Sequence, residues 1–152
     1  MNLVKELGGE TLSGIEQLRA LIASGRRPGI AESLDFRLTE VGEGTAVFTG
    51  TPGPHAFNPV GIIHGGYAAT LLDSACGCAV HSRIAAGQGY TTLELKVAYH
   101  KAITHTTGPI RVEARVLSFG RRVAFSEGKL VDGSGRLYAS ATSTFLILEP
   151  SA

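Results

Sequence analysis

The chain has 152 residues, of which 43% are hydrophobic and 18% are charged. We expect a chain of this length and composition to fold as one domain, spanning residues 1–152, with its own hydrophobic core. The formal net charge is only +1. The chain therefore lacks the large excess of positive charge expected of a protein that binds nucleic acid or an anionic membrane surface.

The first ten residues show no basic region followed by an apolar run, so we expect no secretory signal peptide. No stretch approaches the roughly 18 consecutive apolar residues of a membrane-spanning helix. Cys76 and Cys78 stand two positions apart in an expected helix, where their side chains point to different sides and cannot pair. They also lack a nearby Cys or His pair for a zinc site. These features predict a reduced, cytoplasmic protein without a structural metal.

The N-terminal third predicts one helix and one hairpin. Apolar residues at helical spacing predict an amphipathic helix over residues 11–24, ended by Gly25. Alternating apolar and polar residues then predict strands over residues 33–41 and 45–51, joined by a glycine-containing turn.

The middle of the chain predicts a buried helix. Residues 66–85 are apolar on almost every side, which is typical of a helix inside a core. His81, near its end, is expected at the helix C-terminus or on the surface. Four further segments rich in β-branched and aromatic residues predict strands; these are residues 90–103, 110–119, 122–131 and 137–148. The predicted fold class is α+β, with five or six antiparallel strands curled around one long helix.

Asp73 is the residue of this helix that most needs an explanation, because Leu72, Ala75 and Cys76 around it are apolar. An unpaired carboxylate costs several kcal/mol to bury, so an accidental aspartate is improbable here. The carboxylate could brace the core through a hydroxyl or a cation. Alternatively, poor solvation raises its basicity, and it acts as a nucleophile or a general base.

His64, Gly65 and Gly66 stand where a loop rich in glycine and proline becomes the helix. The first amides of a helix have no intrahelical acceptors and lie at the positive end of its dipole. The amide of Gly65 or Gly66 can therefore stabilise a developing oxyanion. A plain glycine turn is the alternative reading of this tripeptide.

The spacing of these groups predicts a dimer. Gly66 and Asp73 are seven residues apart, which is ~10 Å along a helix axis. A nucleophile must come within ~3–3.5 Å of the carbonyl carbon that it attacks. One chain therefore cannot bring both groups to one carbonyl, whereas two antiparallel helices across a two-fold axis can.

Two stretches of the sequence resemble a known family. Residues 58–75, N-P-V-G-I-I-H-G-G-Y-A-A-T-L-L-D-S-A, closely resemble the signature of hotdog-fold thioesterases of the phenylacetate-pathway (PaaI-like) type. Residues 92–102, T-L-E-L-K-V-A-Y-H-K-A, resemble the strand that follows in those proteins. The resemblance covers most of the chain, from about Leu34 to Leu148.

The resemblance implies an activity and an assembly. The implied reaction is hydrolysis of an acyl- or aryl-acyl-CoA to the free acid and CoA, with coenzyme A present only as part of the substrate and without a metal or redox cofactor. The implied assembly is a homodimer, often paired into a homotetramer. Aryl-acetyl, benzoyl and medium-chain acyl groups all remain open as substrates.

The resemblance also implies roles for individual residues. Asp73 would be the catalytic carboxylate, either attacking the thioester or activating water, and the Gly65 amide would polarise the thioester carbonyl. Asn58 would position the nucleophile or the water, and His64 would orient the loop or the thioester. Thr92 would form a hydrogen bond near the carboxylate or the lytic water.

Two positions depart from the family pattern. Thr91 is an alternative to Thr92, because the connection before this strand is about one residue longer than expected. Lys101 and Ala102 stand where the family often has a basic residue followed by proline, so the bend at this point remains open.

Further residues are candidates for contact with the substrate. Gly66 lies beside the expected oxyanion site, and Tyr67 either helps to form the acyl pocket or packs in the core. The phosphates of CoA require cations at the mouth of the pocket, for which Arg121 and Arg122 are the first candidates and Lys101 and His100 the second.

Two other functions remain as alternatives. A hotdog dehydratase or hydratase acting on a hydroxyacyl thioester would use a histidine base and a helix acid, for which His64 and Asp73 could serve. A non-catalytic acyl-CoA-binding protein would be expected to carry an attached DNA-binding segment, for which the helix before Ser33 is too short.

Overall fold

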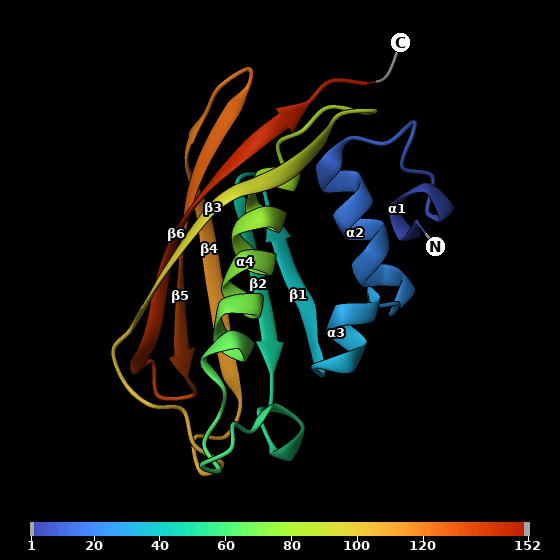
Figure 1. Ribbon diagram of the computed structural model, residues 1–152. Coiled ribbons are helices and arrows are strands. Elements are labelled where there is room, and N and C mark those ends of the chain that lie inside the picture. The colour runs from blue at the N-terminus through green and yellow to red at the C-terminus, as the bar shows by residue number, and fades with distance from the viewer. Residues whose placement is uncertain (1, 151–152) are drawn as a thin grey trace.

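The computed structural model describes residues 2–150 (Figure 1). Its helices and strands are α1 (Leu3–Glu6), α2 (Gly14–Ser24), α3 (Gly29–Ser33), β1 (Phe36–Gly42), β2 (Thr45–Gly50), a 3₁₀ turn (Pro54–Ala56), α4 (Gly65–His81), β3 (Gly89–Tyr99), β4 (Ile110–Phe119), β5 (Val123–Asp132) and β6 (Leu137–Leu148). Within these residues, no helix combines the length and the apolar character needed to cross a membrane.

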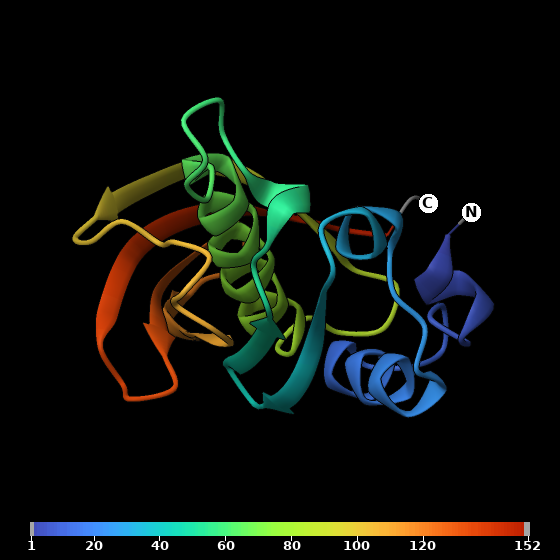
Figure 2. The same ribbon diagram turned by 90° about the horizontal axis from the view of Figure 1, so that it is seen from below.

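The strands form one six-stranded sheet in the order β1-β2-β4-β5-β6-β3, and each pair is antiparallel. The sheet curls around α4, and the three short N-terminal helices lie on the far side of β1 (Figures 1 and 2). This arrangement confirms the predicted α+β hotdog fold. Helices α2 and α3 pack against the edge strand β1, whereas β3 forms the opposite edge.

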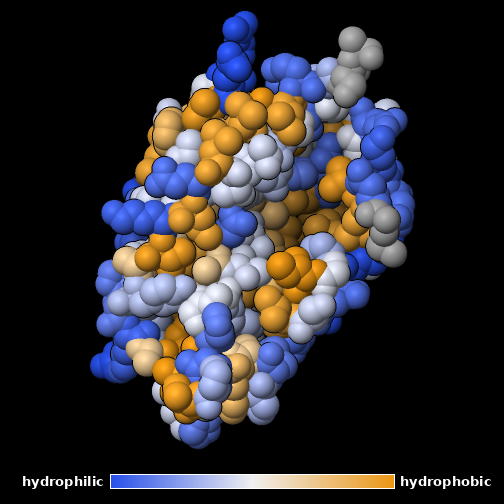
Figure 3. All heavy atoms as spheres, viewed as in Figure 1, coloured by the Kyte–Doolittle hydropathy of each residue, from blue (hydrophilic) through white to orange (hydrophobic). Residues whose placement is uncertain are grey.

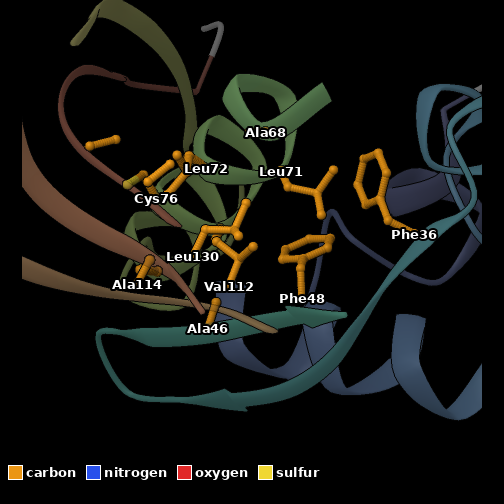
Figure 4. Packing of buried hydrophobic residues seen from close by; sticks show 14 of the residues in the cluster. Phe36, Ala46, Phe48, Ala68, Leu71, Leu72, Cys76, Val112, Ala114 and Leu130 are labelled. Atoms are coloured by element: carbon orange, nitrogen blue, oxygen red, sulfur yellow. The ribbon is translucent and has the colours of Figure 1, made fainter. Parts of the chain in front are cut away.

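The core lies between α4 and the concave face of the sheet. Leu71, Leu72 and Cys76 of α4 have no exposed surface. Figure 4 shows Leu71 directed towards the rings of Phe36 and Phe48, which meet edge to face at 5.7 Å between centroids. One flank of α4 is thereby fixed against β1, β2 and the central strands.

The N-terminal boundaries differ from the predictions because of local capping. Helix α2 begins at Gly14, where the backbone N–H of Ser13 donates to the Glu16 carboxylate at 2.8 Å. It ends before Gly25, as predicted, and Gly25 has a φ of +67°. Helix α3 was not predicted; it shortens the expected strand, so that β1 begins at Phe36.

Helix α4 ends at His81, before the predicted end at residue 85. Ser82 ends it with its hydroxyl, which donates to the carbonyl of Ala79 and accepts from the amide of Gly44, both at 2.7 Å. The helix terminus is thereby joined to the turn between β1 and β2.

Strand β3 ends at Tyr99, before the predicted end at residue 103. The amides of His100 and Lys101 both donate to the carbonyl of Tyr138, at 2.8 and 3.1 Å. Because two successive amides share one carbonyl, the regular pairing of β3 with β6 ends here. The bend therefore forms although Ala102 replaces the proline of the family pattern. Strands β2, β4, β5 and β6 lie within one residue of their predicted bounds.

Helix α2 docks on the C-terminal end of α4 by a very close backbone approach. The Gly14 amide donates to the Ile84 carbonyl at 2.9 Å. A Cβ atom added at Gly14 would lie 1.8 Å from the carbonyl oxygen of His81. Only glycine permits this contact.

His81 is buried, so the predicted surface position is wrong, although the residue does end α4. Gln17 donates its side-chain amide to the carbonyls of Gly9 and Leu12, so its oxygen faces His81 Nε2, 2.7 Å away. Nε2 therefore carries the proton of a neutral ring. Burial lowers the pKa of His81 to about 4.

Replacing Gly14 with alanine should lower the free energy of unfolding by about 1–3 kcal/mol, because the added methyl group must displace α2 from α4. Gly29→Ala is the matched control, since a Cβ at Gly29 meets no atom within 4 Å. Urea unfolding followed by circular dichroism measures both variants. Equal stabilities would contradict the close approach at Gly14.

Acid should weaken the fold through His81. The unfolded chain binds this proton at the ordinary pKa of 6.5, whereas the folded chain binds it only near 4. The stabilisation is therefore complete above about pH 6.5 and is lost as the pH falls towards 4, with a loss of about 2 kcal/mol between pH 7 and 5.

Urea unfolding at these two pH values measures this loss. His81→Gln keeps a donor for Gln17 but cannot titrate. The free energy of unfolding that this variant loses between pH 7 and 5 should therefore be smaller than the wild-type loss by about 2 kcal/mol. An unchanged pH dependence in His81→Gln would show that His81 is not the group responsible.

Candidate active site

Asp73 projects from the middle of α4 towards β3 and is partly buried. The hydroxyl of Thr92 donates to its Oδ1, with 3.1 Å between the oxygen atoms. The carboxylate therefore lies at the border of the core with a hydroxyl partner, and is not enclosed by apolar residues on all sides. The second carboxylate oxygen has no hydrogen bond to any residue between 2 and 150.

Of the two candidate threonines, Thr92 is the one that contacts the carboxylate. It pairs with Phe145 of β6, and the register of β3 shifts between Thr92 and Glu94. Thr91 lines the same cavity as Asp73 but donates no hydrogen bond to it in the described chain.

The start of α4 is capped by its own histidine. His64 Nδ1 accepts a hydrogen bond from the Gly66 amide at 2.7 Å, so the ring proton is on Nε2. The Gly66 amide is thereby occupied. The Gly65 amide makes no hydrogen bond within residues 2–150 and remains available to a ligand.

Tyr99 holds this helix terminus in place. Its hydroxyl donates to the Gly65 carbonyl at 2.6 Å, which joins the end of β3 to the start of α4. Sequence reasoning missed this residue. The available signal was the alternation along β3, which puts Tyr99 on the same face as Leu95 and Val97.

Asn58 organises the loop before α4. Its Oδ1 accepts hydrogen bonds from the amides of Val60 and Ile62, at 3.1 and 3.2 Å. The backbone N–H of Asn58 donates to the Ile62 carbonyl at 2.8 Å, and Gly61 takes a φ of +80°. Only the side-chain NH₂ of Asn58 is left to meet a substrate.

Within one chain these residues form two separate groups. Asn58, His64 and Gly65 lie at the N-terminal end of α4, whereas Asp73 and Thr92 lie near its middle. Eight residues separate Gly65 from Asp73, which corresponds to ~12 Å along the helix. One chain does not bring the free amide and the carboxylate to the same atom.

The candidate cations also lie at different ends of the molecule. Arg122 accepts a backbone hydrogen bond from Ile147, near the C-terminal end of α4, and Arg121 adjoins it. Lys101 lies beyond the end of β3, near Gly65, with its Nζ 5.7 Å from the centre of the Tyr138 ring. All three side chains are exposed.

A cavity of about 1320 Å³ opens beside Asp73 and Thr92. Figure 3 shows the hollow, with apolar side chains in its depth. Helix α4 forms one wall, and the N-terminal helices form the wall opposite. Tyr67 is buried in the core and is absent from the cavity wall, which agrees with the packing alternative.

The two cysteines are poor candidates for chemistry. Burial raises the pKa of the Cys76 thiol to about 11 and that of Cys78 to about 12, so both thiols stay protonated at neutral pH. In the chain from residue 2 to 150, no three His, Cys, Asp or Glu side chains are grouped as a metal site requires.

Comparison with proteins of known sequence gives a family match. The family model of the thioesterase superfamily matches residues 60–139, a range that includes Gly65, Asp73 and Thr92. A protein of Saccharolobus solfataricus, provisionally named an esterase, is 34% identical over 87 residues, which cover 57% of this chain. The match spans 56% of that protein, little more than half of its length.

Solved structures show the same fold. A conserved protein from Pseudomonas aeruginosa is 30% identical, with a TM-score of 0.75 over 80% of this chain and 95% of its own. A protein from Ralstonia eutropha JMP134, provisionally described as a thioesterase and as phenylacetic acid degradation-related, is 26% identical, with a TM-score of 0.76 over 89% of this chain and 99% of its own. The family model, with these matches, identifies the chain as a member of the thioesterase superfamily.

Proposed function

We propose that this protein hydrolyses an acyl-CoA thioester to the free acid and CoA, and that Asp73 is its catalytic carboxylate. The observation that carries the proposal is the hydrogen bond from Thr92 to Asp73 at the wall of a large cavity. Membership of the thioesterase superfamily and the likeness to the PaaI-like pattern support it. The resemblance to the phenylacetic acid protein is distant, so the acyl group has to be inferred from this chain.

Thr92 prepares the carboxylate for its role. Because Thr92 holds Oδ1, the free Oδ2 can remove a proton from water or attack the carbonyl carbon itself. The Gly65 amide then stabilises the negative charge that forms on the carbonyl oxygen. When the tetrahedral intermediate collapses, the C–S bond breaks and the CoA thiolate leaves with the proton that Asp73 took from water. If Asp73 attacks instead, the product is a mixed anhydride, which water hydrolyses to the free acid and the carboxylate while the thiolate takes up the proton from that water.

We propose that two protomers share each site. The ~12 Å between Gly65 and Asp73 within one helix requires a second chain to supply the amide. Strand β3 is a long edge strand, and Leu93 and Tyr99 on it are more than half exposed. Such an edge offers unpaired backbone groups to a second copy of itself. Antiparallel pairing would carry Asp73 towards the partner's Gly65.

The remaining groups have free atoms that suit the proposed roles. The Asn58 NH₂ can donate to the nucleophile or the water, and His64 Nε2–H can donate to the thioester. Arg121, Arg122 and Lys101 are the cations proposed for the CoA phosphates. We also propose a cytoplasmic protein whose dimers pair into a tetramer.

Asp73→Asn should lower the rate of acyl-CoA hydrolysis by at least about 100-fold, because an amide can neither attack nor accept the proton. A panel of acyl-CoAs with a chromogenic thiol reagent measures the release of CoA. Dehydration or hydration of a hydroxyacyl-CoA without thiol release would favour the dehydratase instead. Ligand binding without turnover would favour an acyl-CoA-binding protein.

Thr92→Val should lower the rate about tenfold, which corresponds to the loss of one hydrogen bond to a charged group. Thr91→Val is the matched variant and should remain near the wild-type rate, since Thr91 donates nothing to Asp73. The same thiol assay compares the two. A larger loss in Thr91→Val would transfer the role to Thr91.

Mixing Asp73→Ala with Asn58→Ala protomers should restore activity that neither variant has alone. If each site takes its carboxylate from one chain and its loop from the other, a mixed dimer has one intact site. Random exchange then gives about a quarter of the wild-type activity. Native mass spectrometry confirms the exchange, and no recovery after exchange would refute the shared site.

A further inference from the structure

The peptide group between Gly65 and Gly66 is held at both ends. Its carbonyl accepts a hydrogen bond from the hydroxyl of Tyr99 at 2.6 Å, and its N–H donates to His64 Nδ1 at 2.7 Å. Adjacent glycines have great backbone freedom, and the first N–H groups of a helix have no intrahelical partners. The two hydrogen bonds therefore fix a part of α4 that would otherwise vary in conformation.

The Tyr99 ring lies against Gly65 on the side that a side chain would occupy. A Cβ at Gly65 would be 3.1 Å from the Tyr99 hydroxyl oxygen and 3.2 Å from its Cζ atom. The Gly65 N–H, in contrast, makes no hydrogen bond to any residue that the structure describes. Partial burial raises the pKa of Tyr99, so its hydroxyl keeps its proton at neutral pH and remains a donor. Tyr99 thus secures the carbonyl of Gly65 and leaves its N–H open to a ligand.

Strand β3 carries a second hydroxyl with a corresponding role. Thr92, near the start of the strand, donates to Asp73, whereas Tyr99, at its end, donates to the start of α4. In a site shared by two protomers, Asp73 and Gly65 of one chain belong to different sites. One site then receives the carboxylate with Thr92, and the other receives the Gly65 amide with Tyr99.

We propose that Tyr99 is a positioning residue for the hydrolysis, which directs the Gly65 N–H at the thioester oxygen by holding the Gly65 carbonyl. The inference rests on the proposed function and adds a residue to it. Tyr99 does not touch the reacting atoms. Its effect belongs to the transition state, where negative charge develops on the oxygen and a fixed donor stabilises it most.

Tyr99→Phe keeps the ring and removes only the hydroxyl. It should lower kcat for acyl-CoA hydrolysis about fivefold to tenfold, as the loss of one hydrogen bond predicts. Calorimetry should give an unchanged affinity for S-butyl-CoA, a thioether without a carbonyl. Tyr138→Phe is the matched control, since its hydroxyl donates to Asp132 in the turn between β5 and β6, and it should keep the wild-type kcat. Unchanged kcat in Tyr99→Phe, or an equal loss of kcat and thioether affinity, would overturn the proposal.

Mixed dimers test which site Tyr99 serves. The one intact site of a dimer of Asp73→Ala and Asn58→Ala chains takes its Gly65 amide from the Asp73→Ala chain. Adding Tyr99→Phe to that chain should therefore lower the recovered kcat about fivefold to tenfold. Adding it to the Asn58→Ala chain should change nothing. Equal losses in the two mixtures would show a general structural effect and overturn the positioning role.

NMR of the His64 ring nitrogens tests the arrangement without catalysis. The Nδ1 resonance should show a hydrogen-bond acceptor in the wild-type protein, and in Tyr99→Phe it should move towards that of a free ring, because the peptide group loses one of its two bonds. An unchanged resonance would overturn the inference even if the protein hydrolyses acyl-CoA. Thiol release from no acyl-CoA, with the shift observed, would instead overturn the hydrolysis and leave Tyr99 as the residue that orders the start of α4.

Discussion

The way in which α4 is held between the sheet and the N-terminal helices determines where every candidate group lies. Its apolar flank, which includes Leu71 and Cys76, is buried against the concave face of the sheet. That contact fixes the rotation of the helix, so the flank with Asp73, Gly77 and His81 must face the cavity. The position of the carboxylate thus follows from packing several residues away from it.

The same helix also explains why the site has two parts. Its N-terminus offers the Gly65 amide, and its middle offers a carboxylate whose geometry Thr92 fixes. A rigid helix cannot fold these groups onto one another, because its length per residue is constant. The chemistry that we propose therefore needs two copies, and the open edge of β3 is the surface that we propose for their pairing.

Much of this fold could be predicted from the sequence. Alternating apolar and polar residues predict the strands, and a long run of apolar residues predicts the buried helix, and both patterns are local in the sequence. The ends of the helices and strands were harder to predict. Helix α4 ends where Ser82 meets the Gly44 amide, and no local pattern contains that distant contact. His81 was expected at the helix C-terminus or on the surface, and its burial could not be predicted because its partner, Gln17, lies 64 positions away. Likewise, the His-Gly-Gly motif located the amide, and the alternation along β3 gave the face of Tyr99, but its contact with Gly65 and the cavity depend on tertiary packing.

The attachment of α2 has an evolutionary consequence. The helix is anchored by the backbone of Gly14 and by the amide of Gln17, and neither contact involves its apolar residues Leu21 and Ile22. Those two positions can therefore drift in size while the anchor and the Thr92–Asp73 pair stay as they are. The attachment of α2 and its contribution to the cavity wall therefore depend on different residues, so the wall can change without loss of the contacts that hold the helix.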